Sequence, residues 1–475
     1  MRAWLVSWVI GFNYFVGVYY VIVNLVYTLL LGTSLWVILR YIKRIRYSAI
    51  KDFTSSPEIP PVSVLIAAHN EEGVILQSVN SALSLNYPFF EVIVINDGST
   101  DKTLERLITA YGLKKVDIVY RAVIKTNRVK GFYYNSETPS LRVIDKEKGG
   151  KADALNCGIN ACKSPYFCSA DADSVLESDS LIRLMTPVME SGVPVVACGG
   201  VVRVLNGNKV RNGIVKEIDL PQSSLALFQI VEYLRAFLFG RVGWDTMNAI
   251  LILSGTFSLF NKTAVTEAGG FDVKNVTEDM ELILKLHKYH TIHKKPYRIK
   301  FISDPICWSE VPENFKMLGR QRRRWHMGLI QSILQHKSLL FNPRYGKLGM
   351  LVFPYYLFFE VLGPLIEVLG YITVFISFSL GIVSSEFFFL FLTLAIFYGV
   401  FLSTTGVFLE ELTYRRYPKW SHLFSLLTYG VLENFGYRQL NCLWRSQAML
   451  LFLLGKRKWE HVEYKGTSLM RRQTT

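Results

Sequence analysis

Residues 62–72 read VSVLIAAHNEE and residues 91–98 read EVIVINDG, and these two stretches decide the fold class. Each opens with a short apolar run rich in β-branched residues and closes on polar side chains, a pattern typical of buried parallel strands. A helical stretch over 74–85 separates the two runs. Two such βα units in succession predict an α/β fold built on a doubly wound, mixed sheet. Residues 114–139 are less regular, and no site is predicted there.

The same pattern continues further along the chain. A loop, Gly149-Gly150-Lys151, precedes a predicted helix over 152–161, and a predicted strand over 166–170 leads into Asp171-Ala172-Asp173. Open parallel sheets bind ligands beyond the carboxyl ends of their strands. We therefore expect Asp97 and these two later clusters to lie together at one edge of the sheet.

The cluster Asp171-Ala172-Asp173 supplies two carboxylates at a strand end. Hard oxygen ligands suit Mg²⁺ or Mn²⁺, so Asp171 and Asp173 are predicted to bind one of these ions together with a diphosphate. A solvated turn is the alternative for such a pattern on its own. The Gly-Gly-Lys loop one helix upstream favours the metal site, and Lys151 is placed there to meet a phosphate. An ordinary surface lysine is the alternative for Lys151.

Asp97 belongs to the hexapeptide Asn-Asp-Gly-Ser-Thr-Asp, residues 96–101, at the end of the second strand. A carboxylate there can accept the imide N–H of a uracil, so Asp97 is predicted to bind the nucleoside of a nucleotide donor. Capping of the helix that follows explains Ser99 or Asp101 equally well, but that account does not use Asp97.

Asp279, in the tripeptide Thr277-Glu278-Asp279, is the candidate general base. An acceptor hydroxyl must lose its proton when its oxygen attacks a sugar, and a positioned carboxylate can take that proton. A helix amino terminus capped by Thr277 explains the same residues equally well. Both interpretations stay open.

The stretch Gln321-Arg322-Arg323-Arg324-Trp325 falls in a predicted amphipathic helix over 315–334. Gln321 is predicted to make a polar contact with the acceptor, Arg324 to neutralise a diphosphate and Trp325 to pack its indole on a sugar face. A lipid-headgroup anchor is the alternative for the whole string. Three flanking arginines are predicted to pin this helix to a membrane face: Arg320, Arg322 and Arg323.

Half of the residues are hydrophobic, and they concentrate towards the two ends of the chain. The run over 14–39 is too long for the apolar core of a cleaved signal peptide, so it predicts a retained transmembrane helix. Later segments are predicted, in order, as an interfacial or re-entrant segment, two spans and a hairpin: 348–362, 363–382, 387–408 and 423–454. The total is about five spans.

Polar residues inside these segments are costly to place in lipid, so some are expected to face a path for a polymer. They are Glu360, Glu367, Glu433, Asn434 and Arg438. The net charge of +15 gathers beside apolar runs, which favours attachment to anionic lipid over nucleic-acid binding. Residues 225–239 have helical apolar spacing, which fits a helix on a membrane or one facing a core. Six cysteines form no CxxC pair and predict reduced, partly buried thiols.

Together the four motifs, in the order acid, acid, acid and QxxRW, resemble the processive, membrane-embedded members of the family 2 inverting glycosyltransferases. Cellulose, chitin, hyaluronan and bacterial poly-N-acetylglucosamine synthases belong to that group. The resemblance implies a GT-A fold in a cytoplasmic domain, a UDP-sugar donor, transfer with inversion and a divalent metal. Asn96 departs from the family pattern, in which an acid precedes the position matched by Asp97.

The family's motif positions match the residues singled out above, from the nucleoside-binding acid through the DxD pair and the catalytic base to the QxxRW set: Asp97, Asp171, Asp173, Asp279, Gln321, Arg324 and Trp325. The resemblance also adds one candidate. The segment Ile252–Thr256 resembles the acceptor-side segment of cellulose synthases, which implies that Thr256 contacts the acceptor.

The resulting hypothesis is a hexosyltransferase, a polysaccharide synthase that moves sugar from a UDP-sugar to a growing β-linked polymer and extrudes it through the membrane. UDP-GlcNAc is the favoured donor. A non-processive transferase acting on a lipid-linked or glycolipid acceptor is the alternative, and a transporter or scaffold with an inactive transferase-like domain is a third. The expected partners are the donor, the nascent polysaccharide, the lipid bilayer and an accessory export subunit, with no nucleic acid.

The predicted organisation has five parts, and the basic residues after the first apolar run place that end in the cytoplasm. In order, they are an amino-terminal transmembrane segment, a cytoplasmic GT-A domain, an interfacial helix region carrying QxxRW, a group of transmembrane and interfacial helices, and a cytoplasmic tail: 1–46, 47–314, 315–346, 347–458 and 459–475. The protein is expected in the bacterial inner (plasma) membrane as a multi-pass protein.

Overall fold

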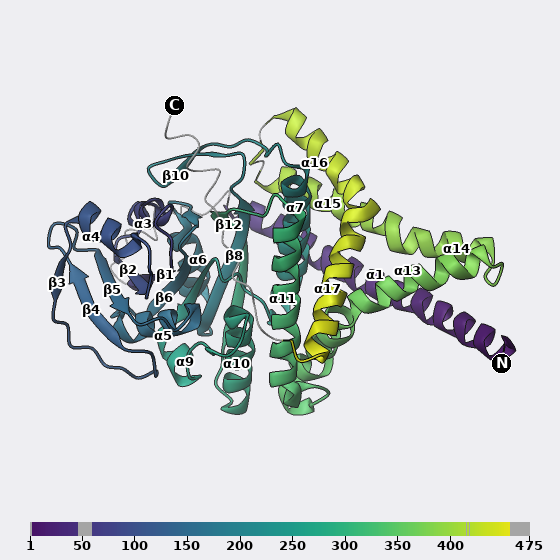
Figure 1. Ribbon diagram of the computed structural model, residues 1–475, viewed down its shortest axis with the longest axis horizontal. Helices are drawn as coiled ribbons and strands as arrows, with labels where there is room; N and C mark the ends of the chain where they lie inside the picture. Colours follow the sequence, from purple (N-terminus) through teal and green to yellow (C-terminus); the bar gives the residue numbers. More distant parts are fainter. Residues whose placement is uncertain (1, 46–58, 415, 418, 457–475) are drawn as a thin grey trace. The chain divides into compact units, whose positions relative to one another are not determined.

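The computed structural model describes residues 2–45, 59–414, 416–417 and 419–456 (Figure 1). The chain divides into two units. Within the described residues, the sheet unit comprises 40–45, 59–222 and 244–311, and the helical unit comprises 2–39, 223–243, 312–414, 416–417 and 419–456. Most of the predicted linker over 51–61 and the whole predicted tail over 459–475 lie outside the described residues.

The sheet unit is built on a ten-stranded mixed sheet, as the sequence predicts. Its parallel centre has the order β5-β2-β1-β6, from Leu141–Lys146, Phe90–Asp97, Val62–Ala68 and Tyr166–Asp171. Beyond β6 come antiparallel β11 and the parallel pair β8 and β12, then short β7: Phe257–Asn261, Val195–Val204, Arg298–Ser309 and Val175–Leu176. The strands β1 and β2 are almost fully buried, which is why they are continuously apolar.

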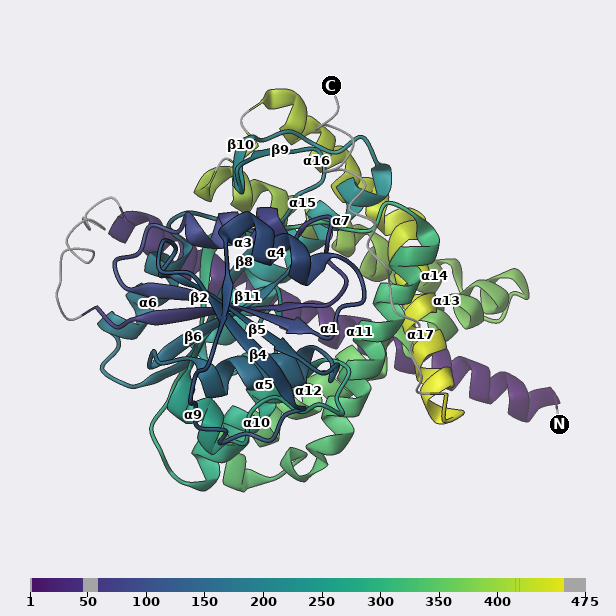
Figure 2. The ribbon, with the colours of Figure 1, turned by 60° about the vertical axis from the view of Figure 1, so that its left-hand side comes forward.

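Two antiparallel strands extend the other edge of the sheet, in the region where the sequence looked irregular. They are β3 (Lys114–Val116) and β4 (Val129–Tyr134). Helices lie on both faces, with α3 and α4 on one and α5 on the other (Figure 2). The remaining described elements of this unit and of its boundary are a small hairpin and seven helices, in chain order α3, α4, α5, α6, β9, β10, α8, α9 and α10: Ile75–Leu83, Thr103–Tyr111, Lys151–Ala161, Ser180–Glu190, Lys209–Arg211, Ile214–Glu217, Val242–Thr246, Lys262–Glu267 and Glu278–Ile292.

The helical unit contains the long apolar helices. Its main elements are α1, α7 with its continuation η1, α11, α13, α14, α15, α16 and α17: Arg2–Ile45, Ser224–Arg235, Ala236–Arg241, Phe315–Gln335, Gly363–Ser379, Ser385–Leu392, Tyr398–Thr413, Trp420–Leu432 and Arg438–Leu453. Short irregular turns η2–η5 and α12 lie between α11 and α13, η6 lies between α14 and α15, and η7 joins α16 to α17: Lys337–Leu339, Pro343–Tyr345, Leu348–Val352, Phe353–Tyr355, Tyr356–Val361, Thr393–Phe397 and Glu433–Tyr437.

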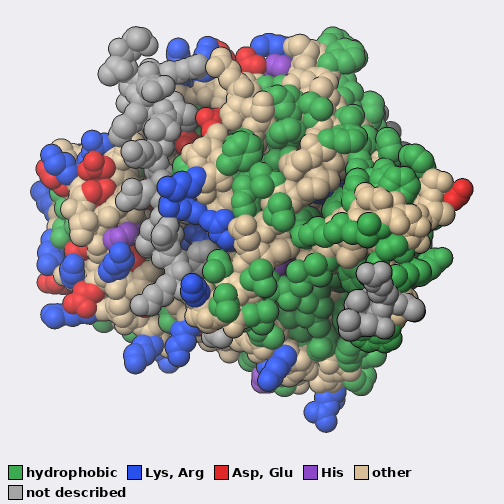
Figure 3. All heavy atoms as spheres, turned by 45° about the vertical axis from the view of Figure 1, so that its right-hand side comes forward, with side chains coloured by type: hydrophobic (Ala, Val, Ile, Leu, Met, Phe, Trp, Pro, Cys, Tyr) green, Lys and Arg blue, Asp and Glu red, His purple; other side chains and the backbone are tan. Residues whose placement is uncertain are grey.

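Among the described residues, two helices are long and apolar enough to cross a membrane, Val6–Arg40 and Ser385–Thr413. A pair bent by 45°, Leu348–Val361 with Gly363–Ser379, raises the number to three if it counts as one span. Hydrophobic side chains gather on the surface of this unit (Figure 3), and Leu25 and Phe401 are each more than half exposed. Such exposure is typical of a surface that contacts lipid or another protein.

The expectation of about five spans is therefore too high for the described residues. The predicted hairpin over 423–454 is wrong. The helices α16 and α17 are joined at a sharp break in η7, where Phe435 and Gly436 leave the helical conformation. They pack on different partners, α16 along α15 and α17 along α11 and α13. All six cysteines are free and buried, as predicted.

Candidate active site

Polar groups from several strand ends meet at the carboxyl edge of the parallel sheet, as predicted. Asp97 ends β2 and Asp171 ends β6, and both strands pair with β1 between them. Two helices begin at the same edge, α5 at Lys151 and α10 at Glu278. The sequence-predicted acids of the sheet unit are therefore brought together, with a lysine among them.

Lys151 connects three of these segments. Its Nζ lies 2.5 Å from Asp171 Oδ1 and 3.3 Å from Glu278 Oε1, and it donates to the carbonyl oxygen of Gly255 at 3.3 Å. Burial by itself lowers the pKa of Lys151, but the charges of Asp171 and Glu278 outweigh burial and raise it. Lys151 is thus a fixed cation among carboxylates, which an ordinary surface lysine would not be.

Asp279 points at the same glycine. Its Oδ2 accepts the N–H of Gly255 at 2.9 Å. Burial raises the pKa of Asp279, the charge of Glu278 adds to the rise, and Lys151 opposes it. Thr277 occupies the N-cap position of α10 but makes no side-chain capping bond, so capping by Thr277 does not explain this tripeptide.

Gly255 lies in the segment Ile252–Thr256 that the family resemblance named, but no role was predicted for this glycine. Its N–H bonds Asp279 and its carbonyl bonds Lys151, and a Cβ built on it would lie 2.9 Å from Asp279 Oδ2. The next residue, Thr256, accepts the N–H of Asp171 on its carbonyl at 3.1 Å. The segment Ile252–Thr256 therefore lies against the DxD pair and the candidate base, and a glycine at 255 permits that close approach.

Asp97 is tied to the loop that carries Lys151. Its carboxylate accepts the N–H groups of Gly149 and Gly150 at 2.8 and 2.7 Å, and it pairs with Lys146 Nζ at 2.7 Å. Lys146 is fully buried and lies 2.5 Å from Asp153 as well. Asp97 thus holds the Gly-Gly turn in place, which is a second task beside the predicted contact with a nucleoside.

The sequence missed Lys146 and Asp153. A signal was available, because a lysine that ends an apolar strand needs a buried anion nearby. Burial lowers the pKa of Lys146, but hydrogen bonds to Asp153 and Asp97 outweigh burial and raise it. Asn96, the departure from the family pattern, donates to Asp145 Oδ1 at 2.7 Å. An acid at position 96 would repel Asp145, so the amide fits its neighbour.

Carboxylates crowd the side of the site next to the DxD pair. Burial and the nearby charges of Asp171 and Glu310 raise the pKa of Asp173 to about 7. Burial and the charges of Asp173 and Asp171 raise the pKa of Glu71 to about 8. A divalent cation would offset this repulsion, and hard carboxylate oxygens are the ligands that Mg²⁺ and Mn²⁺ prefer. The donor set therefore fits the predicted metal.

These acids do not form a closed metal cage. Among the described residues, no group of three or more His, Cys, Asp or Glu side chains converges on one point. A Mg²⁺ ion commonly takes one or two carboxylates and completes its shell with substrate phosphates. Asp171 and Asp173 suit that second kind of site.

The QxxRW residues lie on α11 of the helical unit, a helix capped by the Asn314 side chain, which accepts the N–H of Met317 at 2.9 Å. Gln321 is buried, Arg324 is exposed, and the Trp325 side chain is 36% exposed. An exposed cation and an accessible indole suit contacts with a ligand.

The prediction that Arg322 pins α11 to lipid headgroups is wrong. Arg322 is only 5% exposed, and its Nη2 lies 2.8 Å from Glu232 Oε2 on α7. Three consecutive arginines in the sequence favour a membrane interface. In the structure, however, Arg322 lies on the side of α11 that packs against α7. The helix over 225–239, left open between a membrane surface and a core, supplies its partner and buries most of its apolar side chains.

Several other charged residues of the helical unit form ion pairs within it. Three glutamates each meet an arginine, in the pairs Glu360–Arg445 at 3.1 Å, Glu367–Arg438 at 3.7 Å and Glu433–Arg235 at 2.6 Å. The fifth predicted polar residue, Asn434, donates to the carbonyl of Gly430 at 2.9 Å. Pairing lowers the cost of holding these groups among apolar helices.

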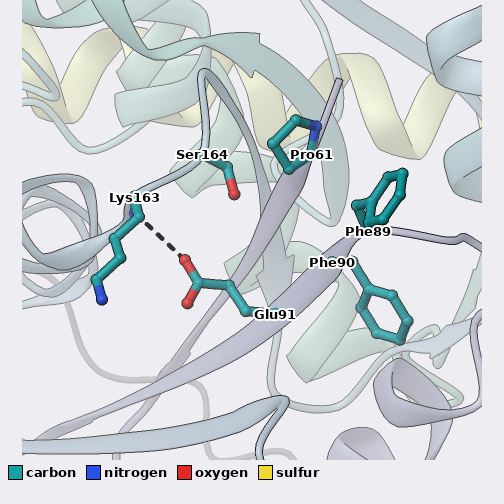
Figure 4. A pocket seen from close by; sticks show the side chains of 6 residues that line it. All are labelled: Pro61, Phe89, Phe90, Glu91, Lys163 and Ser164. Atoms are coloured by element: carbon teal, nitrogen blue, oxygen red, sulfur yellow. Dashed lines mark hydrogen bonds between the residues drawn. The ribbon is translucent and has the colours of Figure 1, made fainter. Parts of the chain in front are cut away.

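A hollow lies at the amino-terminal ends of the parallel strands, and it is not the candidate site. Figure 4 shows its lining, which comprises Pro61, Phe89, Phe90, Glu91, Lys163 and Ser164. It lies where β1 and β2 begin, whereas the acids lie where the strands end. Its one acid, Glu91, already accepts from Ser63 Oγ at 2.6 Å and pairs with Arg142.

Comparison with known proteins gives matches to glycosyl transferase families and to polysaccharide synthases. Residues 63–267 match the family described as glycosyl transferase family 2, and residues 167–432, more than half of the chain, match glycosyl transferase family group 2. The poly-β-1,6-N-acetyl-D-glucosamine synthase of Staphylococcus epidermidis is 30% identical over 271 residues, which are 57% of this chain and 55% of that protein. The synthase of the same name from Staphylococcus aureus is 30% identical over 291 residues, or 61% and 59%.

Among solved structures, a mannosyltransferase from Pyrobaculum calidifontis in complex with GDP-Man and Mn²⁺ aligns with a TM-score of 0.49 at 17% identity, over 87% of this chain and 99% of that one. The sequence matches to the synthases span little more than half the length of those relatives.

Proposed function

Because the chain belongs to glycosyl transferase family group 2 and is a glycosyltransferase, we propose that it is a processive polysaccharide synthase. Its donor is a UDP-sugar, with UDP-GlcNAc favoured. Its product is a β-linked polymer that passes through the bacterial plasma membrane as it grows. The residues that carry the chemistry are those of the carboxyl edge of the sheet together with the QxxRW residues of α11.

One observation carries the proposal. Lys151 and Asp279 both bond the backbone of Gly255, and Lys151 also pairs with Asp171, so a cation, a DxD acid and a candidate base are linked through one lysine and one glycine. The names of the synthases that are 30% identical support GlcNAc as the sugar and a polymer as the product. The Trp325 indole, accessible on the surface of its helix, supports an extended sugar acceptor.

The reaction follows from these groups. Asp279 takes the proton of an acceptor hydroxyl while that oxygen attacks the anomeric carbon of the donor sugar. The new carbon–oxygen bond forms as the bond to the diphosphate oxygen breaks, and UDP leaves with the electron pair. Attack from the side opposite the leaving group inverts the anomeric carbon. The raised pKa of Asp279 makes it a stronger base than an exposed carboxylate.

The leaving diphosphate needs positive charge. Lys151 supplies one cation at the amino terminus of α5, where the helix dipole also favours an anion. Asp171 and Asp173 would hold Mg²⁺ or Mn²⁺, which when bound supplies further charge neutralisation. Arg324 is the proposed third cation. Asp97 keeps Lys151 in position through the two glycine N–H groups and is proposed to contact the uracil as well.

The membrane part of the proposal draws on the helical unit. Two to three of its described helices have the length and hydropathy of spans, and three of its glutamates, Glu360, Glu367 and Glu433, pair with arginines. A polar seam of this kind suits the passage of a hydrated sugar chain. The donor, the nascent polysaccharide and the bilayer are then the partners, and an accessory export subunit remains a candidate partner.

A donor panel tests the reaction. Purified protein in lipid is incubated with UDP-GlcNAc, UDP-glucose, UDP-glucuronate or GDP-mannose, and nucleotide release is measured. UDP release from UDP-GlcNAc well above the other three is expected. Release of no nucleotide from any donor, with or without added Mg²⁺ or Mn²⁺, would count against the sugar and the enzyme role together.

Product size separates the two acceptor classes. With labelled UDP-GlcNAc, a processive synthase yields long chains at early times, while a non-processive transferase adds single sugars to lipid. A labelled product that partitions entirely with lipid and carries one sugar would replace the polymer proposal with the lipid-acceptor alternative.

A further inference from the structure

Arg322 occupies a position between Gln321 and Arg324 for which the reaction gives no role, yet it is the most buried of the three arginines in the motif. Its Nη2 lies 2.8 Å from Glu232 Oε2 on α7. The hydroxyl of Tyr437, at the end of η7, donates to the same Glu232 oxygen at 2.8 Å. Three helical segments of the helical unit thus meet at one carboxylate.

The other side of Arg322 faces Trp325. The guanidinium carbon lies 4.5 Å from the centre of the indole, over the ring. The two residues are three apart on α11, so their side chains emerge on the same face of the helix. A buried guanidinium over an indole is an attractive cation–π contact. Because Arg322 covers one face of the ring, the platform is one-sided, and the remaining face is the one left for a ligand.

The surroundings of this contact are tightly packed. The rings of Phe228 and Tyr437 stack at 4.8 Å with an interplanar angle of 18°. On α11 a Cβ at Gly319 would lie 2.9 Å from the Trp444 indole nitrogen, so α11 and α17 run in close contact along this stretch (Figure 1). The carboxylate that holds Arg322 is therefore itself held by neighbouring helices.

We propose that Glu232 and Tyr437 are positioning residues for the acceptor platform. They fix Arg322 flat against Trp325, and Arg322 in turn fixes the indole so that its free face meets the terminal sugar of the nascent polymer. This inference rests on the proposed acceptor role of Trp325. It goes beyond that role in naming what orients the ring and which of its faces is available.

The test uses the full chain in lipid, with UDP-GlcNAc as donor and a short oligosaccharide of the product as acceptor. Two variants weaken the support without touching the ring, Glu232→Gln and Tyr437→Phe. We expect Glu232→Gln to raise the KM for the oligosaccharide about tenfold and to shorten the polymer, because one cation–π contact loses its fixed geometry. The KM for UDP-GlcNAc should not change. Tyr437→Phe should act in the same direction with a smaller shift.

A matched control lies in the same neighbourhood. Tyr429 on α16 also packs against Phe228, at 5.0 Å, but its hydroxyl bonds Ser224 at 2.8 Å instead of Glu232. Tyr429→Phe removes the same single oxygen and should leave both KM values and the polymer length as in the wild type. Arg322→Lys keeps the charge but loses the flat face, so it should resemble Glu232→Gln.

The Trp325→Ala background decides between positioning and general stability. If Glu232 acts through the ring, adding Glu232→Gln to Trp325→Ala changes nothing further. An equal loss in both backgrounds, or a parallel rise of both KM values, would overturn the inference and make the contact merely structural. If Trp325→Ala by itself leaves acceptor KM and polymer length unchanged, the acceptor role fails first, and the inference fails with it.

Discussion

The carboxylates of the two units are balanced in different ways. At the carboxyl edge of the sheet, five acids crowd together, and Lys151 is the cation that the described ion pairs bring to them: Glu71, Asp171, Asp173, Glu278 and Asp279. In the helical unit each glutamate of the described pairs has its own arginine: Glu232–Arg322, Glu360–Arg445, Glu367–Arg438 and Glu433–Arg235.

This difference distinguishes acids that take part in ligand binding or in the reaction from acids that stabilise the fold. Excess negative charge costs stability unless a cation or a proton is supplied, so a protein retains it where a ligand or a reaction needs it. Charges that are matched one to one leave nothing for a ligand to neutralise, and breaking a pair then costs stability. Changes at the sheet edge should therefore act on turnover, and changes in the helical unit should act on stability or on the geometry of Trp325.

The largest expected effect is at the DxD pair. Asp173→Asn removes one of the two proposed metal ligands, and we expect it to abolish turnover, as excess EDTA should in the wild type. Nucleotide release measures both. Glu105→Gln, an exposed acid on α4, is the matched control and should keep wild-type activity. Full activity in excess EDTA would remove the metal role from Asp171 and Asp173.

The second effect concerns the base. Asp279→Asn keeps the shape of the side chain but cannot accept the proton, so transfer should fall by roughly 10²–10⁴-fold while donor binding survives. Transfer is followed by nucleotide release and donor binding by calorimetry. A joint loss of transfer and donor binding would make Asp279 structural.

Much of this site followed from the sequence, and the exceptions have a common cause. Strand β1 was predicted with its observed bounds, since strands buried on both faces are continuous apolar runs. The edge strands β3 and β4 are partly exposed and lack that signal, so they were missed. Lys146 pairs with an acid 49 residues away, Gly255 with a lysine 104 away, and Arg322 with an acid 90 away. No local pattern reveals such partners.

The third prediction uses one of these long-range contacts, the one at Gly255. Gly255→Ala places a Cβ 2.9 Å from Asp279 Oδ2, so the carboxylate must shift while the fold can remain. A misplacement of about 1 Å can cost on the order of 10²-fold in kcat. Gly192→Ala, where a Cβ would meet nothing within 4 Å, is the control. Equal kcat values for the two variants would show that Asp279 needs no exact placement by this backbone.

The fourth prediction moves to the helical unit. Glu433→Gln leaves Arg235 without its anion, and breaking a buried pair costs about 3–5 kcal/mol, here towards the low end because Arg235 is 25% exposed. Glu217→Gln breaks the exposed pair with Lys209 and should cost no more than about 1 kcal/mol. Thermal unfolding of both variants in detergent measures the contrast. Equal midpoints would refute the idea that the paired charges are there for support.

The smallest effect is a pH dependence of stability in the sheet unit. His287 is fully buried on α10, its Nε2 bonds the carbonyl of Ile250 at 2.8 Å, and its Nδ1 bonds the hydroxyl of Tyr297 at 2.7 Å. A carbonyl can only accept, so Nε2 carries the proton and Nδ1 accepts from the tyrosine. Burial, with the charge of His290 adding to it, lowers the pKa of His287 to about 4.

Because this folded-state pKa lies below the value of about 6.5 for an unfolded histidine, the contribution of neutral His287 is fully present above pH 6.5 and is lost as the pH falls from there to about 4. Between pH 7 and pH 5 the loss amounts to about 2 kcal/mol. His287→Gln should flatten the unfolding midpoint against pH over that interval, although it lowers the midpoint at every pH. His290→Gln is the comparison variant. Burial lowers the pKa of His290 as well, so the slope of the midpoint against pH in this variant measures the part that His290 contributes. An unchanged slope in His287→Gln would mean that His287 takes up its proton over the same pH range in the folded and the unfolded protein. The acid sensitivity of this unit would then belong to the crowded carboxylates at the sheet edge.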